Sequence, residues 1–364
     1  MPRTVHIILT ADYEIFGDGS GDVRRSVIEP TAQILELCEK YSAPMTLFFE
    51  VGEYWAFLRE REKLIEDLGC DPAALMEEQG RAAHSRGHDL QLHLHPQWLE
   101  AKYENKKWIL NMDHWRLPKL PLGAVEEESS ITGALYRGKQ TLEGMLQPVN
   151  PAYACLAFRA GALCIQPSAD FHQAAKTVGL RIDSSVSKGY VNLQPPSLVD
   201  FREAHHRHRP WYADPMDIIR PGVREPNGLL EVPIASIRQP VIKQISLSEV
   251  LTHFRGAPKD NAVHPSPSAP MSFPSRLRRL FTPVYTGWDF GLPSGRRLVK
   301  ILEKLIRDCD QPVNPLVMIG HPKTFFAPHG FEGFLRLTKE KFIDVGRAQF
   351  STFPEFLKAY EGRT

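Results

Sequence analysis

Residues 87–96 read Gly-His-Asp-Leu-Gln-Leu-His-Leu-His-Pro, and residues 316–322 read Leu-Val-Met-Ile-Gly-His-Pro. Each is a strand-like apolar run that stops at a histidine beside a proline. Residues 10–14, Thr-Ala-Asp-Tyr-Glu, end a third such run with two carboxylates. In α/β proteins the carboxyl ends of the strands carry the chemistry, so these segments predict a polar site at one edge of a sheet.

Short apolar runs alternate with helical patterns along the whole chain. This alternation predicts one barrel-like α/β domain rather than two domains. We predict strands at 4–11, 43–51, 89–95, 154–159, 180–186, 229–235 and 316–321. We predict helices at 30–41, 132–145, 167–178 and 294–309.

Composition excludes several classes of protein. The 364 residues carry 44 Lys and Arg against 43 Asp and Glu, so the net charge of +1 predicts no nucleic-acid partner. No apolar stretch approaches the roughly 18 residues of a transmembrane segment, and the N-terminus shows no secretion-signal pattern. The five cysteines are odd in number and form no CxxC pair, which favours a reducing compartment. We therefore expect a cytoplasmic protein.

Three long irregular segments interrupt the pattern, at 98–128, 188–227 and 256–292. Loops of this length inside a domain are usually functional or mobile. We expect the first two to wall a substrate cleft, and part of the third, at 257–275, to be disordered.

Asp12 and Glu14 are two residues apart after an apolar strand, so in extended backbone both point to one face. Adjacent carboxylates repel, and a divalent metal would neutralise them while leaving one acid free as a base. The alternative is a solvated strand end or a helix cap.

His93 and His95 repeat this spacing, and imidazole suits zinc and related metals. The alternative is a packed structural pair. Gln97 continues the alternation, but Pro96 interrupts the strand. We expect His95 rather than Gln97 to be a ligand, because imidazole binds such metals better than a neutral amide does.

Three further residues end predicted strands. His321 is of the residue type that most often serves as a general acid, although a packed core histidine is the alternative. Arg159 needs a carboxylate partner if it is buried. Asp183 could join Arg159 in orienting a catalytic carboxylate, or could simply cap a turn.

Taken in chain order, these segments resemble the motifs of the polysaccharide deacetylase family, the NodB-homology domain of carbohydrate esterase family four. Residues 10–14 take the place of its T-F-D-D motif, with the second acid displaced by one residue. Residues 45–52, MTLFFEVG, are similar to A-T-F-F-V-x-G, and residues 87–93 match G-H-E-I-x-x-H before the chain departs from the pattern. Arg159 keeps only the arginine of R-x-P-Y.

The resemblance implies a distorted (β/α)7 barrel, one domain over 1–364 with long inserted loops. Its core would span about 4–330, with a helical extension over 331–364. It also implies a metal-dependent deacetylase that removes an acetyl or formyl group from an amino sugar, for example in surface-polysaccharide biosynthesis, with zinc as the expected ion. The implied roles are Asp12 as base, Arg159 and Asp183 as its supports, His321 as acid, and Glu14, His93 and His95 as metal ligands.

Two alternatives remain at this stage. One is another hydrolase on the same barrel, acting on a cyclic amide or on a glycoside. A glycosidase would need two carboxylates about 5 to 10 Å apart and no metal. The other is a non-catalytic barrel that binds a glycan or a protein.

Overall fold

Seven parallel strands form the centre of the computed structural model, which describes residues 3–240, 283–292 and 294–362. All seven predicted strands are present, but their ends differ from the prediction. The strands predicted at 180–186 and 229–235 are only two residues long, and the one predicted at 316–321 lies three residues earlier. The seven strands are β1 (Thr4–Tyr13), β2 (Met45–Glu50), β3 (Asp89–Leu94), β6 (Ala157–Ala160), β7 (Ile182–Asp183), β11 (Leu230–Glu231) and β14 (Val313–Met318).

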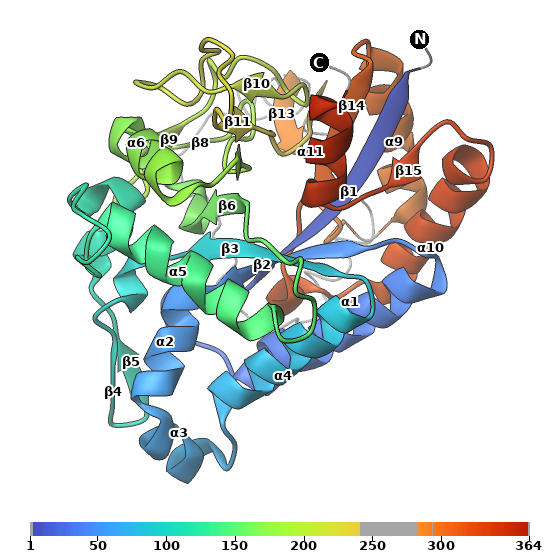
Figure 1. Ribbon diagram of the computed structural model, residues 1–364. Coiled ribbons are helices and arrows are strands. Elements are labelled where there is room, and N and C mark those ends of the chain that lie inside the picture. The colour runs from blue at the N-terminus through green and yellow to red at the C-terminus, as the bar shows by residue number, and fades with distance from the viewer. Residues whose placement is uncertain (1–2, 241–282, 293, 363–364) are drawn as a thin grey trace, which may run out of the picture.

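The sheet curls until its two ends meet (Figure 1). Its order is β10-β11-β7-β6-β3-β2-β1-β14, where β10 (Trp211–Tyr212) runs antiparallel to β11. The chain just after β11 reaches β14, because Ala235 N–H donates to the Val317 carbonyl at 2.9 Å and Ile234 bridges Val317 in parallel. The strands therefore close into a barrel, which is distorted because β7 and β11 are only two residues long.

The strands are buried on both faces, as expected for parallel strands covered by helices. Every residue of β2, β3 and β14 is buried. A separate apolar cluster takes side chains from most strands and three from the helix α11 (Phe353–Glu361). Its members include Ile8, Phe48, Ala157, Ile182, Leu230, Val317, Phe353 and Phe356.

The predicted helices form with small shifts in their ends. They are α1 (Glu29–Lys40), α5 (Ile131–Leu146), α6 (Ala169–Val178) and α9 (Gly295–Asp308). Ser130 and Ser294 cap α5 and α9 by accepting hydrogen bonds from backbone N–H groups of the first turn. The remaining helices are α2 (Val51–Arg59), α3 (Arg61–Leu68), α4 (Pro72–Ser85) and α10 (Pro328–Thr338). Figure 1 shows α1, α4 and α5 along the outer side of the strands.

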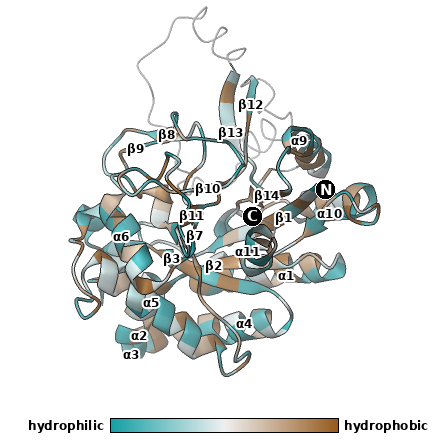
Figure 2. Ribbon diagram, turned by 45° about the horizontal axis from the view of Figure 1, so that its top comes forward, coloured by the Kyte–Doolittle hydropathy of each residue, from teal (hydrophilic) through white to brown (hydrophobic). Residues whose placement is uncertain are grey.

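The long insertions form hairpins outside the barrel. They contain β4 (Lys102–Glu104) with β5 (Lys107–Ile109), β8 (Val191–Asn192) with β9 (Val199–Asp200), and β12 (Ser236–Pro240) with β13 (Pro283–Gly287). The β12–β13 hairpin stands out from the barrel in Figure 2. The disorder expected at 257–275 concerns residues outside the described ranges.

The C-terminal segment packs against the barrel. After α10, β15 (Gln349–Phe350) pairs in parallel with His6 and Ile7 of β1, and α11 follows. This segment therefore contributes a short strand as well as helices. Within the described ranges, no helix is both long and apolar enough to cross a membrane.

Candidate metal centre

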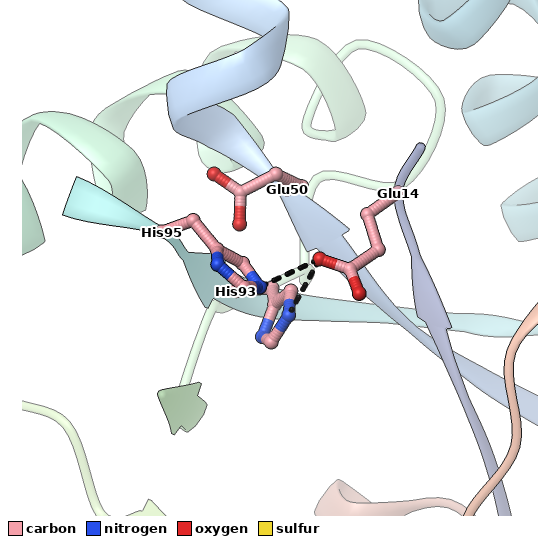
Figure 3. A group of neighbouring side chains, drawn as sticks. All are labelled: Glu14, Glu50, His93 and His95. Atoms are coloured by element: carbon pink, nitrogen blue, oxygen red, sulfur yellow. Dashed lines mark ion pairs between the residues drawn. The ribbon is translucent and has the colours of Figure 1, made fainter. Parts of the chain in front are cut away.

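Four buried side chains converge at the carboxyl end of the barrel strands: Glu14, Glu50, His93 and His95 (Figure 3). One donor atom from each lies within 4.8 Å of the others. Glu14 follows β1, Glu50 ends β2, and His93 and His95 come from the end of β3. Glu50 and His93 are opposite each other in the β2–β3 register. We refer to these four residues as the metal centre.

The two imidazoles present Nε2 toward the same carboxylate. His93 Nδ1 lies 2.8 Å from the Arg159 carbonyl, which can only accept, so Nδ1 carries the proton and Nε2 is free in the neutral ring. Glu14 Oε2 lies 3.4 Å from His93 Nε2 and 2.7 Å from His95 Nε2. Both Nε2 atoms are buried and lack hydrogen-bond geometry to any partner. When the His93 ring is neutral, its Nε2 and Glu14 Oε2 are two acceptors that face each other, so a proton or a metal ion must lie between them.

Each glutamate is held through its other oxygen. Glu50 Oε1 caps α2 by accepting from the Gly52 N–H at 2.9 Å, while its Oε2 is buried without a hydrogen bond. Glu14 Oε1 accepts from Lys323 Nζ at 2.7 Å. The centre therefore offers two imidazole nitrogens and two carboxylate oxygens, a donor set that fits a divalent transition metal.

The charges at the centre explain its pKa shifts. Burial alone would raise the pKa of Glu14, but Lys323 and the two histidines hold it well below its usual value. Burial also opposes a charge on His93, yet the carboxylates of Asp12 and Glu14 raise the pKa of this imidazole to about 9. Burial raises the pKa of Glu50, partly offset by His95 and His93. The same negative field that attracts a proton would attract a metal ion.

Asp12 lies beside the centre and is tied to Arg159. The guanidinium Nη1 donates to Asp12 Oδ1 at 2.6 Å, and Nε donates to the Ser184 carbonyl at 2.9 Å. Burial would raise the pKa of Asp12, but Arg159, His93 and His321 hold it below its usual range. His321 Nε2 is 3.4 Å from Asp12 Oδ2, and 30% of the His321 side chain is exposed. The structure thus brings Asp12, Arg159 and His321 together.

Asp183 lies close enough to Arg159 to feel its charge. Within the described residues, no hydrogen bond or ion pair joins Asp183 to Asp12. The Asp183 carboxylate accepts from the Ser185 hydroxyl at 2.8 Å and from the Ser185 N–H at 3.0 Å. Glu231 is its register partner on β11. The supporting role of Asp183 for Asp12 therefore stays a prediction.

Two departures from the motifs have a structural reason. Gly161 follows Arg159 at the end of β6, and a Cβ there would lie 2.4 Å from Cγ of the His95 ring. A larger side chain at 161 is therefore incompatible with His95 in its position. Gln97 does not join the metal centre; its amide contacts His95 Nδ1 at 3.0 Å and the Gly17 carbonyl at 3.2 Å.

Only one of the two long loops expected to wall the site reaches the metal centre among the described contacts. Trp115, in the loop at 98–128, meets the His95 ring edge-on with centroids 6.0 Å apart. Trp98 and Trp211, at the ends of irregular segments, are buried in the core.

Three residues near the site were not predicted. Glu50 ends the apolar run Leu47-Phe48-Phe49, and an acid in that position is the same signal that identified Asp12. Lys323 lies two residues after His321, where no pattern distinguishes it from a surface lysine. Asp289 bridges Ile319 on the strand end before His321; burial raises its pKa and the positive charge of His321 partly offsets this.

Comparison with solved structures identifies the fold, whereas the sequence comparisons find no match. No protein-family model matches the chain, and no curated protein matches it in sequence. A solved structure from Parabacteroides distasonis, described as a glycoside hydrolase/deacetylase, is 11% identical with a TM-score of 0.54; the alignment covers 100% of this chain and 72% of that one. One from Mycobacterium smegmatis, described as a polysaccharide deacetylase, is also 11% identical, with a TM-score of 0.48 and coverage of 99% and 91%.

The fold assignment rests on the first of these similarities. It confirms the predicted distorted (β/α)7 barrel. Polysaccharide deacetylases are among the solved structures similar to this chain. At this level of identity the similarity defines the fold of the chain and leaves its activity to the chemistry of the site.

Proposed function

We propose that the protein is a metal-dependent hydrolase that removes an N-acyl group, acetyl or formyl, from an amino sugar. The observation that carries the proposal is the pair of buried acceptors, His93 Nε2 and Glu14 Oε2, which face each other at 3.4 Å beside an ionised Asp12. A bound divalent ion would satisfy both acceptors and would supply Lewis-acid activation of a water molecule and of the acyl carbonyl.

Asp12 is the general base in this proposal. Its Oδ1 is fixed by Arg159, which leaves Oδ2 to accept a proton from the attacking water. Arg159 is itself fully buried and anchored on Ser184, so it restricts the carboxylate to one orientation. Precise placement of this kind lowers the entropic cost of reaching the transition state.

His321 is the general acid. It is the most exposed of the proposed catalytic groups, which suits contact with an entering substrate. Its proton would pass to the nitrogen of the leaving amine as the acyl C–N bond breaks.

The proposal also includes the cellular compartment in which the enzyme acts. The five cysteines are all free, and four of them are buried. Free thiols suit a reducing compartment, and we therefore place the enzyme in the cytoplasm, where it would act on a small or nucleotide-linked amino sugar.

Product release from a panel of substrates tests the function. The purified protein would be loaded with a divalent metal and incubated with N-acetyl and N-formyl amino sugars, a cyclic amide and a chromogenic glycoside. Acetate or formate release that disappears on metal removal and returns on re-addition supports the proposal. Metal-independent turnover of the glycoside would favour a glycosidase, and metal-dependent turnover of the cyclic amide alone would favour a different C–N hydrolase.

A further inference from the structure

The number of donor atoms at the metal centre restricts the ion that it can use for catalysis. We propose that Glu50 is a fourth protein ligand, and that the centre holds an ion that accepts five or six ligands, such as Mn²⁺, Fe²⁺ or Co²⁺, rather than four-coordinate zinc. The inference rests on the proposed function, because only a hydrolytic centre needs positions for water and substrate.

Glu50 is placed like a ligand. The N-terminus of α2 fixes its Oε1, and the backbone of β2 pairs Glu50 with His93 of β3. The remaining oxygen, Oε2, is buried and makes no hydrogen bond, and Glu50 belongs to the four-residue group of converging donors. A buried carboxylate oxygen without a partner is costly, and coordination to a cation removes that cost.

Glu53 shows that burial near the centre is not sufficient. It lies one turn later on α2 and is also buried, and burial together with Glu50 raises its pKa well above the usual value. Its Oε2 accepts from the Ile15 N–H at 3.0 Å, and its Oε1 is buried without a hydrogen bond, as Glu50 Oε2 is. Glu53 has no donor atom in the converging group. Both glutamates are therefore buried, and they differ in that only Glu50 directs a carboxylate oxygen toward the other donors of the metal centre.

The supports of the ligands fix the donor count at four. Lys323 occupies Oε1 of Glu14, and the Gly52 N–H occupies Oε1 of Glu50. Each glutamate is thus left with one oxygen for a metal, and each histidine offers one ring nitrogen, which must be deprotonated to bind. The set is two nitrogens and two oxygens.

Coordination chemistry then separates the candidate ions. Catalytic zinc sites combine three protein ligands with one open position, whereas four protein ligands close a tetrahedral site. With four donors, open positions remain only on an ion of higher coordination number. Mixed imidazole and carboxylate donors suit Mn²⁺, Fe²⁺ and Co²⁺.

Cobalt binding to the metal-free full-length protein tests the ligand. We expect Glu50→Gln to bind Co²⁺ about 10- to 100-fold more weakly than wild type, the range known for residues that support a metal site. Glutamine keeps an oxygen for the α2 cap, so the fold should survive. The matched control, Glu53→Gln, should bind Co²⁺ as wild type does. Wild-type affinity in Glu50→Gln would overturn the assignment.

The visible spectrum of the wild-type cobalt protein tests the ion class without any substitution, so the test holds even if Glu50→Gln fails to fold. Five- or six-coordinate Co²⁺ absorbs weakly, and an intense four-coordinate spectrum would overturn the inference. His93→Ala separates this inference from the proposed function. If His93→Ala loses Co²⁺ while Glu50→Gln keeps it, only the role of Glu50 is wrong; if both keep it, the metal centre itself is wrong.

Discussion

Two groups of buried ionisable side chains lie on the same barrel, and their polar atoms are satisfied in different ways. In the metal centre, two imidazole nitrogens and a carboxylate oxygen converge without hydrogen bonds. In the second group, Asp183 and Glu231 face each other in register on β7 and β11, and we call them the acid pair.

The acid pair is neutralised by a proton. Burial and the neighbouring Asp183 raise the pKa of Glu231 well above its usual value, so one acid stays protonated beside the other. Asp183 accepts from Ser185, and Glu231 Oε1 accepts from the Val186 N–H, while Glu231 Oε2 is buried without a hydrogen bond. Buried carboxylates alone therefore do not define a metal site. His93 makes the difference, because its Nδ1 donates to the Arg159 carbonyl and leaves Nε2 free in the neutral ring.

Metal analysis gives the sharpest test of this comparison. We expect about one divalent ion per chain in the wild type and none in His93→Ala or Glu14→Ala, because each removes a donor that no neighbour replaces. Asp183→Asn, in the acid pair, should keep full occupancy. Full metal content in both metal-centre variants, measured by elemental analysis, would remove the distinction between the two groups.

The next largest effect should come from His321. We expect His321→Ala to keep its metal and to lose activity by about 10²- to 10⁴-fold, the usual contribution of a general acid or base. A substrate with an activated phenolate leaving group needs no protonation, so its hydrolysis should fall much less. Equal losses on both substrates would mean that His321 supports the site instead of donating a proton.

Gly161 tests whether the close approach of β6 to His95 matters. A methyl group there would overlap the His95 ring and displace it, and a displacement of about 1 Å can cost on the order of 10²-fold in rate. We expect Gly161→Ala to lower kcat/KM by about that factor and to weaken metal binding. Gly144→Ala, on α5 where a Cβ meets nothing within 4 Å, is the matched control and should be as active as wild type. Unchanged metal affinity in Gly161→Ala would show that the loop adjusts.

The sequence predicted the barrel well because each strand is an apolar run bounded by turns. It also predicted that Asp12 and Glu14, and His93 and His95, point to one face, since side chains two apart on a strand share a face. Glu50 was within reach of the same argument, because it too ends an apolar strand. The C-terminal strand β15 could not be predicted by this argument, since a strand of two residues shows no alternation of apolar and polar side chains.

Other features depend on contacts between distant segments. Lys323 reaches Glu14 across 309 residues of sequence, and its role follows from the turn after β14. After Arg159 the chain departs from the third motif. The structure gives the reason, because Gly161 lies against the His95 ring and leaves no room for a side chain. Local spacing in the sequence does not predict that Asp183 and Glu231 lie opposite each other in register. Nor does it predict that Asp289 lies close enough to His321 to feel its charge.

The smallest expected effect concerns the acid pair and is a change in stability. The folded state holds the proton of Glu231 above the usual pKa of 4.5, whereas the unfolded state releases it near that value. The native protein therefore binds more protons, and its stability falls as the pH rises from about 4.5 toward the raised value. Glu231→Gln removes this loss, and its amide can donate to Asp183.

We therefore expect Glu231→Gln to match wild type near pH 4 and to become more stable than wild type by up to about 1.4 kcal/mol for each pH unit above that. Urea denaturation at a series of pH values measures the difference, with Glu66→Gln at an exposed position of α3 as the control. Metal content should not change, because the acid pair lies outside the converging donor group. A variant that is less stable than wild type at neutral pH, or that loses its metal, would show that the acid pair is ionised and linked to the metal centre, and the contrast between the two groups would fail.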